Sequence, residues 1–254
     1  VHSEPALIVS SVSFPGPPHL LRQLNRAVVD DAPQDLASPV EVVGGLLATE
    51  GLHPLEGDLD NVARLQDIGY RMMGLHHFFD NELGGSLHGV AQSGLTEFGR
   101  DVVRELERRG ILIDVAHSSA AVVEDVLELT ASPIFVSHTG VKGACDSPRN
   151  LPDPLMQRIA ATGGVIGIGY WDGAVCDPSP ESVVRALRYA VDLLGVDHVA
   201  LGSDYDGATT VTFDTSELAV LTRLMLQAEF SEAEIRAVMG ENVVRVFRER
   251  LPEA

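Results

Sequence analysis

Short apolar segments that alternate with helical patterns constrain the fold of this 254-residue chain more than any other feature. The strand candidates lie at residues 6–13, 42–49, 70–76, 111–116, 133–137, 164–170 and 198–203. Most of them are almost continuously apolar, which is typical of parallel strands buried on both faces. The helical segments between them predict right-handed βαβ units. These seven segments are one short of a closed eight-stranded barrel, and an open doubly wound sheet fits the same count.

Several predicted helices begin at a residue that can cap them. The side chains of such residues accept a hydrogen bond from the first-turn amides, and the candidates are Asp58, Thr96, Asp153, Ser179 and Ser231. Ser231 and Glu234 form a capping box for the last helix, which is expected to present Ile235, Val238 and Val244. No linker rich in Gly, Pro or Ser divides the chain, so residues 1–254 are expected to form a single domain.

The charge and cysteine content exclude several classes of protein. A formal net charge of −19, from 37 acidic against 18 basic side chains, argues against nucleic acid or an anionic membrane as partner. No apolar run approaches the roughly 18 residues of a membrane span, and no signal peptide is recognised. The two cysteines, Cys145 and Cys176, do not suggest a disulfide framework. We therefore expect free thiols and a cytoplasmic enzyme.

Polar residues follow five of the predicted strands, each at the carboxyl end of its strand. They are Glu50, His77, His117, His138 and Asp204. Each has an ordinary explanation when taken alone, such as a loop hydrogen bond for a histidine or a helix cap for an aspartate. A βα barrel, however, gathers the carboxyl ends of its strands on the face that carries the active site. Imidazole and carboxylate ligands together favour Zn²⁺ or a similar divalent ion.

Short motifs around these residues occur in a characteristic order. They are ATEG at 48–51, IDVAH at 113–117, VSH at 136–138, SPRNL at 147–151 and GSDYDG at 202–207. Together they resemble the membrane (renal) dipeptidase family, which are zinc peptidases on an amidohydrolase-like TIM (β/α)8 barrel. The segment 69–85, with HFFDN at 77–81, resembles a bacterial branch of that family. The resemblance extends from about residue 42 to residue 252, and the ordered set is far more specific than any single motif.

The resemblance implies a two-zinc site. Glu50 matches the carboxylate that bridges the two Zn²⁺ ions, and His117 and His138 match the two histidine ligands of one ion.

The resemblance also implies three roles beside the metals. Asp204 matches the acid/base aspartate, and His77 matches the histidine that contacts the substrate. Arg149 matches the arginine that binds the free carboxylate of the dipeptide, a role that suits a guanidinium fork.

The chain departs from the family at its beginning. The family holds its other zinc ion with a His-x-Asp pair on the first barrel strand, and no such pair occurs here. His2 and Glu4 have a similar spacing, but no apolar segment precedes them. The segment 6–13 then corresponds to the second strand of the family. We therefore expect a barrel that lacks its first strand, either by truncation or as a natural variant with one damaged metal site.

The predicted function is that of a zinc-dependent dipeptidase, which hydrolyses the peptide bond of a dipeptide through a metal-bridging hydroxide. One alternative is an inactive or one-metal relic of the same fold that serves as a binding protein. Another is a different amidohydrolase-type reaction, such as lactone or cyclic-amide hydrolysis, which the Arg149 match disfavours. A homodimer is compatible with a barrel of this kind.

Overall fold

The predicted strands form one parallel sheet whose spatial order follows the order of the chain. The computed structural model describes residues 7–11, 44–205 and 209–251. The strands are β1 Leu7–Ser11, β2 Gly44–Thr49, β3 Tyr70–Gly74, β4 Leu112–Asp114, β5 Phe135–Thr139, β6 Val165–Ile168 and β7 Val199–Leu201. Each strand pairs in parallel with the next. A doubly wound sheet reverses its order at a switch point, so the sequential order selects the barrel-type arrangement.

The sheet is open between its first and last strands. Among the described residues β1 and β7 are the two edges, and no ladder joins them. An open sheet of this order is what we predicted for a barrel that is one strand short. The possible ligands His2 and Glu4 lie outside the described residues.

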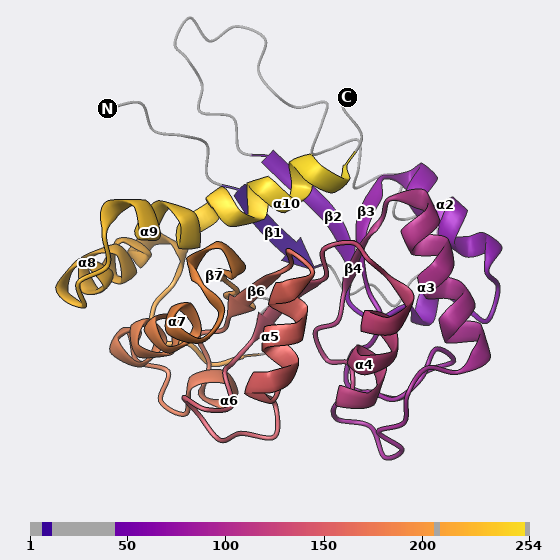
Figure 1. The fold of residues 1–254 in the computed structure, drawn as a ribbon, viewed down its shortest axis with the longest axis horizontal. Coiled ribbons are helices and arrows are strands. Elements are labelled where there is room, and N and C mark those ends of the chain that lie inside the picture. The colour runs from indigo at the N-terminus through magenta and orange to yellow at the C-terminus, as the bar shows by residue number, and fades with distance from the viewer. Residues whose placement is uncertain (1–6, 12–43, 206–208, 252–254) are drawn as a thin grey trace, which may run out of the picture.

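Helices follow the strands and cover the outer side of the sheet. They are α2 Asp60–Ile68, α3 Glu97–Arg109, α4 Ala120–Leu129, α5 Asp153–Ala161, α6 Asp172–Val175, α7 Pro180–Leu194, α8 Ala219–Gln227, α9 Glu232–Arg236 and α10 Asn242–Arg250. Short 3₁₀ turns occur at His53–Leu55, Val196–His198 and Thr215–Glu217. In Figure 1, α3, α4, α5 and α7 lie outside the sheet, whereas α10 crosses one end of it. Within the described segments, no helix has both the length and the apolar character needed to cross a bilayer.

Most of the predicted helix ends are confirmed. The side chains of Thr96, Ser179 and Ser231 cap α3, α7 and α9, and Ser231 makes the predicted capping box with Glu234. The prediction for Asp58 is wrong, because Leu59 is at the cap position of α2 and Asp58 lies one residue before it, although its carboxylate accepts from the amide of Asp60 at 3.0 Å. The prediction for Asp153 is also wrong, because α5 begins at this residue and its carboxylate caps nothing. That carboxylate instead accepts hydrogen bonds from the Tyr189 hydroxyl at 2.6 Å and from a loop amide at 3.0 Å.

The last predicted helix is interrupted. A π-helical segment, Ala237–Glu241, separates α9 from α10, and Gly240 leaves the helical backbone region within it. The interruption rotates the following turn, so that Val243 and Val246 face the core while Val244 is only partly buried.

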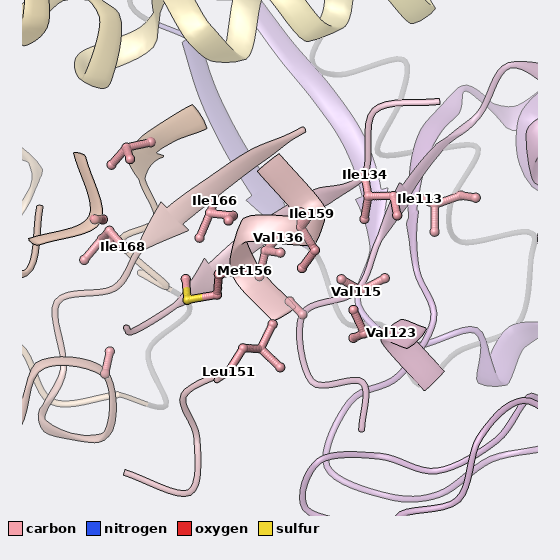
Figure 2. Close-up of a cluster of buried hydrophobic side chains, with 14 of the residues drawn as sticks. Ile113, Val115, Val123, Ile134, Val136, Leu151, Met156, Ile159, Ile166 and Ile168 are labelled. Carbon is pink, nitrogen blue, oxygen red and sulfur yellow. The ribbon is translucent and has the colours of Figure 1, made fainter. Parts of the chain in front are cut away.

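The outer face of the sheet packs against the helices. Ile113, Val136 and Ile166 project from neighbouring strands and are almost completely buried. Met156 and Ile159 of α5 cover them, as Figure 2 shows. This layer is the larger of the two hydrophobic cores.

The inner face of the sheet forms a smaller core that α10 closes. Leu112, Phe135 and Val165 each begin a strand, and they cluster with Val246 and Phe247 of α10. The rings of Phe135 and Phe247 are stacked with their centroids 5.9 Å apart. Because α10 covers the amino ends of the strands, the carboxyl ends remain available for a functional site.

Candidate metal centre

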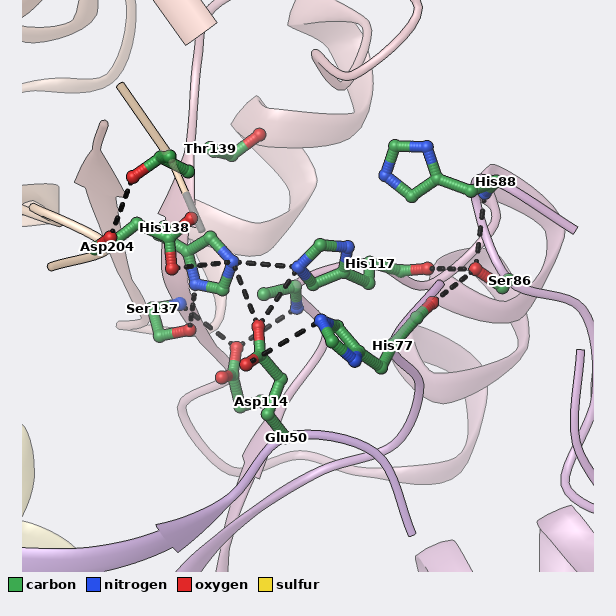
Figure 3. Close-up of polar contacts among 12 residues, drawn as sticks. Glu50, His77, Ser86, His88, Asp114, His117, Ser137, His138, Thr139 and Asp204 are labelled. Atoms are coloured by element: carbon green, nitrogen blue, oxygen red, sulfur yellow. Dashed lines mark hydrogen bonds and ion pairs between the residues drawn. The ribbon is translucent and has the colours of Figure 1, made fainter. Parts of the chain in front are cut away.

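The five polar residues predicted at the strand ends lie together. Glu50 follows β2 directly, and the other four lie at or just beyond the carboxyl ends of their strands. Figure 3 shows the side chains of Glu50, His77, His117 and His138 turned toward one another. One detail of the prediction is corrected: β5 extends to Thr139, so His138 is part of the strand and does not follow it.

Glu50 is the centre of the cluster. Its Oε1 atom lies 3.0 Å from Nε2 of His117 and 3.3 Å from Nε2 of His138. Its Oε2 atom lies 3.8 Å from Nε2 of His77. Two groups with the spacing of metal ligands result, Glu50–His77–His117 and Glu50–His138–Asp204. Glu50 belongs to both groups, as a carboxylate shared by two metal positions must.

The donor set fits a divalent cation such as Zn²⁺. The Nε2 atoms of His117 and His138 are only 2.8 Å apart, and both face the same Glu50 oxygen. Lone pairs on two neutral imidazoles and a carboxylate repel one another at these distances unless a cation or a proton lies among them. Buried nitrogen and carboxylate donors that converge in this way are the ligands zinc prefers.

The protonation states also suit metal binding. Burial raises the pKa of Glu50, but hydrogen bonds with His117 and His138 outweigh it and hold this pKa well below its ordinary value. Glu50 is therefore ionised at neutral pH. Burial lowers the pKa of His117 to about 3, and the contact with Glu50 only partly compensates. His117 is thus neutral at pH 7, which is the form that coordinates a metal ion.

Two of the site residues have a strained backbone. His117 has φ 62° and Asp204 has φ 56°, both in the left-handed region that residues other than glycine seldom adopt. Gly51, directly after Glu50, has φ 83°, and a Cβ there would lie 2.7 Å from a ring atom of His53. Strain of this kind persists where the surrounding structure holds a functional side chain in position.

Arg149 lies beside the cluster and is only 6% exposed. Its guanidinium donates to the carbonyl of His138 at 2.8 Å and to the Thr139 hydroxyl at 3.3 Å. It also lies over the ring of Trp171, with 5.4 Å between the guanidinium carbon and the ring centroid. Burial lowers the pKa of Arg149 to about 10, against the opposing effect of nearby carboxylates that include Asp204. These described contacts use two of its five N–H groups.

The prediction of free thiols is wrong. Cys145 and Cys176 form a disulfide, with their Cα atoms 5.6 Å apart. The bond joins the loop after β5, which carries Arg149, to the end of α6. Counting cysteines cannot reveal this bond, because the pairing depends on α6 packing beside that loop. The cytoplasmic location, which rested partly on free thiols, stays a prediction.

Several residues near the centre were not identified from the sequence. The hydroxyl of Ser86 donates to the carbonyls of His77 at 2.5 Å and His117 at 3.2 Å, and so joins two site residues. The ring of His88 lies 5.4 Å from that of His117. Neither residue follows a strand, so no pattern indicated them. Asp114 did leave a signal, since it is a carboxylate within an otherwise apolar strand.

A comparison with known families agrees with this geometry. The sequence model of the membrane dipeptidase family (Peptidase family M19) matches residues 27–252. The chain belongs to this family. An uncharacterized dipeptidase from Schizosaccharomyces pombe is 30% identical over 217 residues, which are 81% of this chain and 53% of that protein. The chain thus spans about half the length of this curated relative.

Solved structures support the same assignment. A metallopeptidase from Rhodobacter sphaeroides, liganded with a phosphinate mimic of the dipeptide L-Ala-D-Ala, superposes with a TM-score of 0.75 at 25% identity. That match covers 96% of this chain and 69% of the other. An amidohydrolase from Pseudomonas aeruginosa superposes with a TM-score of 0.84 at 22% identity, covering 97% and 89% of the two chains. The second likeness supports the fold alone. The predicted amidohydrolase-like α/β fold is confirmed.

Proposed function

We propose that this protein is a zinc-dependent dipeptidase. The observation that carries the proposal is that Glu50 is shared between two groups of metal-binding donors in a member of the membrane dipeptidase family. The dipeptide mimic bound by the Rhodobacter sphaeroides metallopeptidase supports a dipeptide as the substrate class.

The metal would be held by Glu50, His117 and His138. His77 completes the group that contains His117, and Asp204 completes the group that contains His138. A bound divalent ion polarises a carbonyl and lowers the pKa of a water molecule toward neutrality. The chain contributes ionised Glu50, neutral His117 and a largely buried setting that strengthens electrostatic interactions.

Three side chains would act on the substrate. Arg149 has N–H groups beyond those in its described contacts, and these suit the carboxylate of a dipeptide in a bidentate pair. The His77 side chain is 25% exposed and can donate an N–H to the substrate carbonyl oxygen, where negative charge develops. Asp204, with Oδ1 3.8 Å from Nε2 of His138, can accept a proton from water and transfer it to the leaving amine.

The test is hydrolysis by the full chain after its metal content has been defined. Chelator-treated protein is reloaded with Zn²⁺, zinc per chain is measured by mass spectrometry, and amine release is followed over a dipeptide panel that includes L-Ala-D-Ala. We expect turnover that requires zinc and is lost in Glu50→Gln. Glu124→Gln, on the exposed face of α4, is the matched control and should retain activity. A folded, zinc-loaded sample without turnover would contradict the proposal and favour a binding role.

A further inference from the structure

A row of aromatic rings crosses the candidate metal centre. The rings of His117 and His138 lie at its middle, with their centroids 4.8 Å apart, and both face Glu50. The ring of Phe78 lies 5.5 Å from that of His117, and the ring of Trp171 lies 5.8 Å from that of His138. Among the described residues no ring contact joins Phe78 to His138 or Trp171. Phe78 and Trp171 therefore flank opposite ends of the centre.

The two ends of this row differ in charge. At the His138 end, the Arg149 guanidinium donates to the His138 carbonyl and lies over the ring of Trp171. At the other end, the rings of Phe78 and His88 lie 5.3 Å apart, and both contact the ring of His117. Figure 3 shows His88 and His117 to one side of Glu50 and His138 to the other. One end thus offers a positive charge, and the other offers a mainly aromatic surface.

These ends set the direction of a bound dipeptide, an argument that rests on the proposed function. The free carboxylate belongs at Arg149 and the peptide bond at the metal centre, so the N-terminal residue lies toward His117. One residue extends at most about 3.6 Å along the backbone, and its side chain extends further. The N-terminal side chain can therefore reach Phe78, whose ring centroid is 5.5 Å from that of His117.

Phe78 is open to such a contact. Its ring lies 4.3 Å from that of His77, yet the residue remains 46% exposed. Apolar surface that is left in water is stabilised when another apolar group covers it. We propose that Phe78 is a specificity-determining residue, which contacts the N-terminal side chain of the dipeptide and favours a large apolar side chain over glycine at that position.

The loop that carries Phe78 is held in place. Its Asp80 carboxylate accepts hydrogen bonds from the amides of Ser86 at 2.8 Å and Ala91 at 3.0 Å. A Cβ atom at Gly89 would collide with the same carboxylate, so glycine allows the loop to close there. The amide of Leu87 donates to the carbonyl of His117 at 2.7 Å and so joins the loop to the metal centre. A wall held in this way can discriminate between side chains without first becoming ordered.

Two variants test the contact through a ratio. The ratio divides kcat/KM for L-Leu-D-Ala by kcat/KM for Gly-D-Ala, which differ only in the N-terminal side chain. A single methylene group in a hydrophobic pocket is worth roughly 10- to 200-fold in discrimination. Because Phe78 forms one wall and not a closed pocket, we expect Phe78→Ala to lower the ratio about tenfold, near the lower limit. Phe78→Leu keeps an apolar side chain and should keep the ratio within about threefold of the wild type.

Two controls separate this role from a general disturbance of the site. Phe79→Ala removes the neighbouring phenylalanine, which is 74% exposed and makes no ring contact among the described residues. It should leave the ratio unchanged. The second control is the ratio of kcat/KM for L-Ala-D-Leu to that for L-Ala-Gly, which reports on the C-terminal residue. Phe78→Ala should leave this second ratio unchanged, whereas a displaced metal centre or Arg149 would alter it.

The experiment uses the zinc-loaded full chain and its variants, with folding checked by urea unfolding. Calorimetry also gives the Kd values of phosphinate mimics of L-Leu-D-Ala and Gly-D-Ala. A Phe78→Ala ratio within about twofold of the wild type, or equal changes in both kinetic ratios, would overturn the inference. If the wild type binds the mimics but hydrolyses no dipeptide, the proposed function fails, and the ratio of the two Kd values decides this inference. A wild type that binds neither mimic would overturn both.

Discussion

Breaking the Cys145–Cys176 disulfide should lower the free energy of unfolding by several kilocalories per mole. The bond closes a loop with a sequence separation of 31 residues, which contains β6 and α5 as well as Arg149. Reduction leaves the folded backbone free to keep its contacts, but it lets the unfolded chain explore many more conformations. The effect is therefore expected mainly in the stability of the whole fold.

The magnitude follows from the loop length. The chain-entropy relation for a separation of 31 residues gives about 3.7 kcal/mol at 25 °C. A domain of ordinary stability has a free energy of unfolding of about 5–15 kcal/mol, so this loss is a large fraction of the total. The reduced protein should unfold at a clearly lower urea concentration, with little change in the slope of the transition.

Urea unfolding with and without dithiothreitol is the appropriate assay. Cys176 is exposed whereas Cys145 is buried, so a soluble thiol can attack the bond from the Cys176 side. The double variant Cys145→Ala/Cys176→Ala is the control, because dithiothreitol should not change its transition. Its stability should lie near that of the reduced wild type, apart from the small loss of packing at position 145.

A difference of less than about 1 kcal/mol between the oxidised and reduced wild type would refute the reasoning. It would mean that the two cysteines do not form the bond in solution, or that the unfolded chain holds this loop closed without it. Free-thiol titration of the unreduced protein distinguishes these two explanations.

Further predictions concern the metal, the substrate and the two cores. Free Zn²⁺ at 100 times its Kd should raise the free energy of unfolding by about 2.7 kcal/mol in calorimetry, and Glu50→Ala should abolish this shift. Arg149→Ala should lower kcat/KM for dipeptides roughly 10- to 150-fold, the value of a hydrogen bond to a charged group. The kcat/KM for dipeptide amides should fall much less. An equal fall in kcat/KM for dipeptides and their amides would exclude a carboxylate-binding role for Arg149. Burial lowers the pKa of His76 from 6.5 to about 4. Between these two pH values the unfolded chain binds a proton that the folded chain does not. The free energy of unfolding should therefore fall by roughly 3 kcal/mol as the pH drops from 6.5 to 4. In the His76→Gln variant, urea titrations across that pH range should not show this part of the loss of stability. Phe247→Ala should cost about 3–5 kcal/mol because it leaves a cavity in the inner core, whereas Leu226→Ala, at a side chain 53% exposed, should change stability by less than about 0.5 kcal/mol.

The strands and most helix caps could be predicted from the sequence because their causes are local. An almost continuous apolar run such as residues 164–170 indicates a buried strand whatever its neighbours are. A threonine such as Thr96 caps the helix that begins beside it. Asp153 failed as a cap because its carboxylate is engaged by Tyr189, 36 residues away.

The members of the candidate site could also be predicted, because barrel topology brings the ends of parallel strands together. The sequence alone therefore predicts that Glu50, His117 and His138 lie together. Their protonation was not predictable, because the pKa of His117 depends on how completely the fold buries it. The choice between a barrel and a doubly wound sheet likewise required the spatial order of the strands.

By itself, the sequence determined which segments become strands, which strand ends carry metal-binding side chains, and which family the motifs resemble. Only the tertiary structure decided that Cys145 bonds Cys176, that α10 closes the inner core, and that Ser86 joins the backbones of His77 and His117. The physical reason is the distance along the chain over which each interaction acts. Apolar periodicity and capping act within a few residues, whereas a disulfide, a core contact or a hydrogen-bonded chain needs groups from distant segments within a few ångströms of one another.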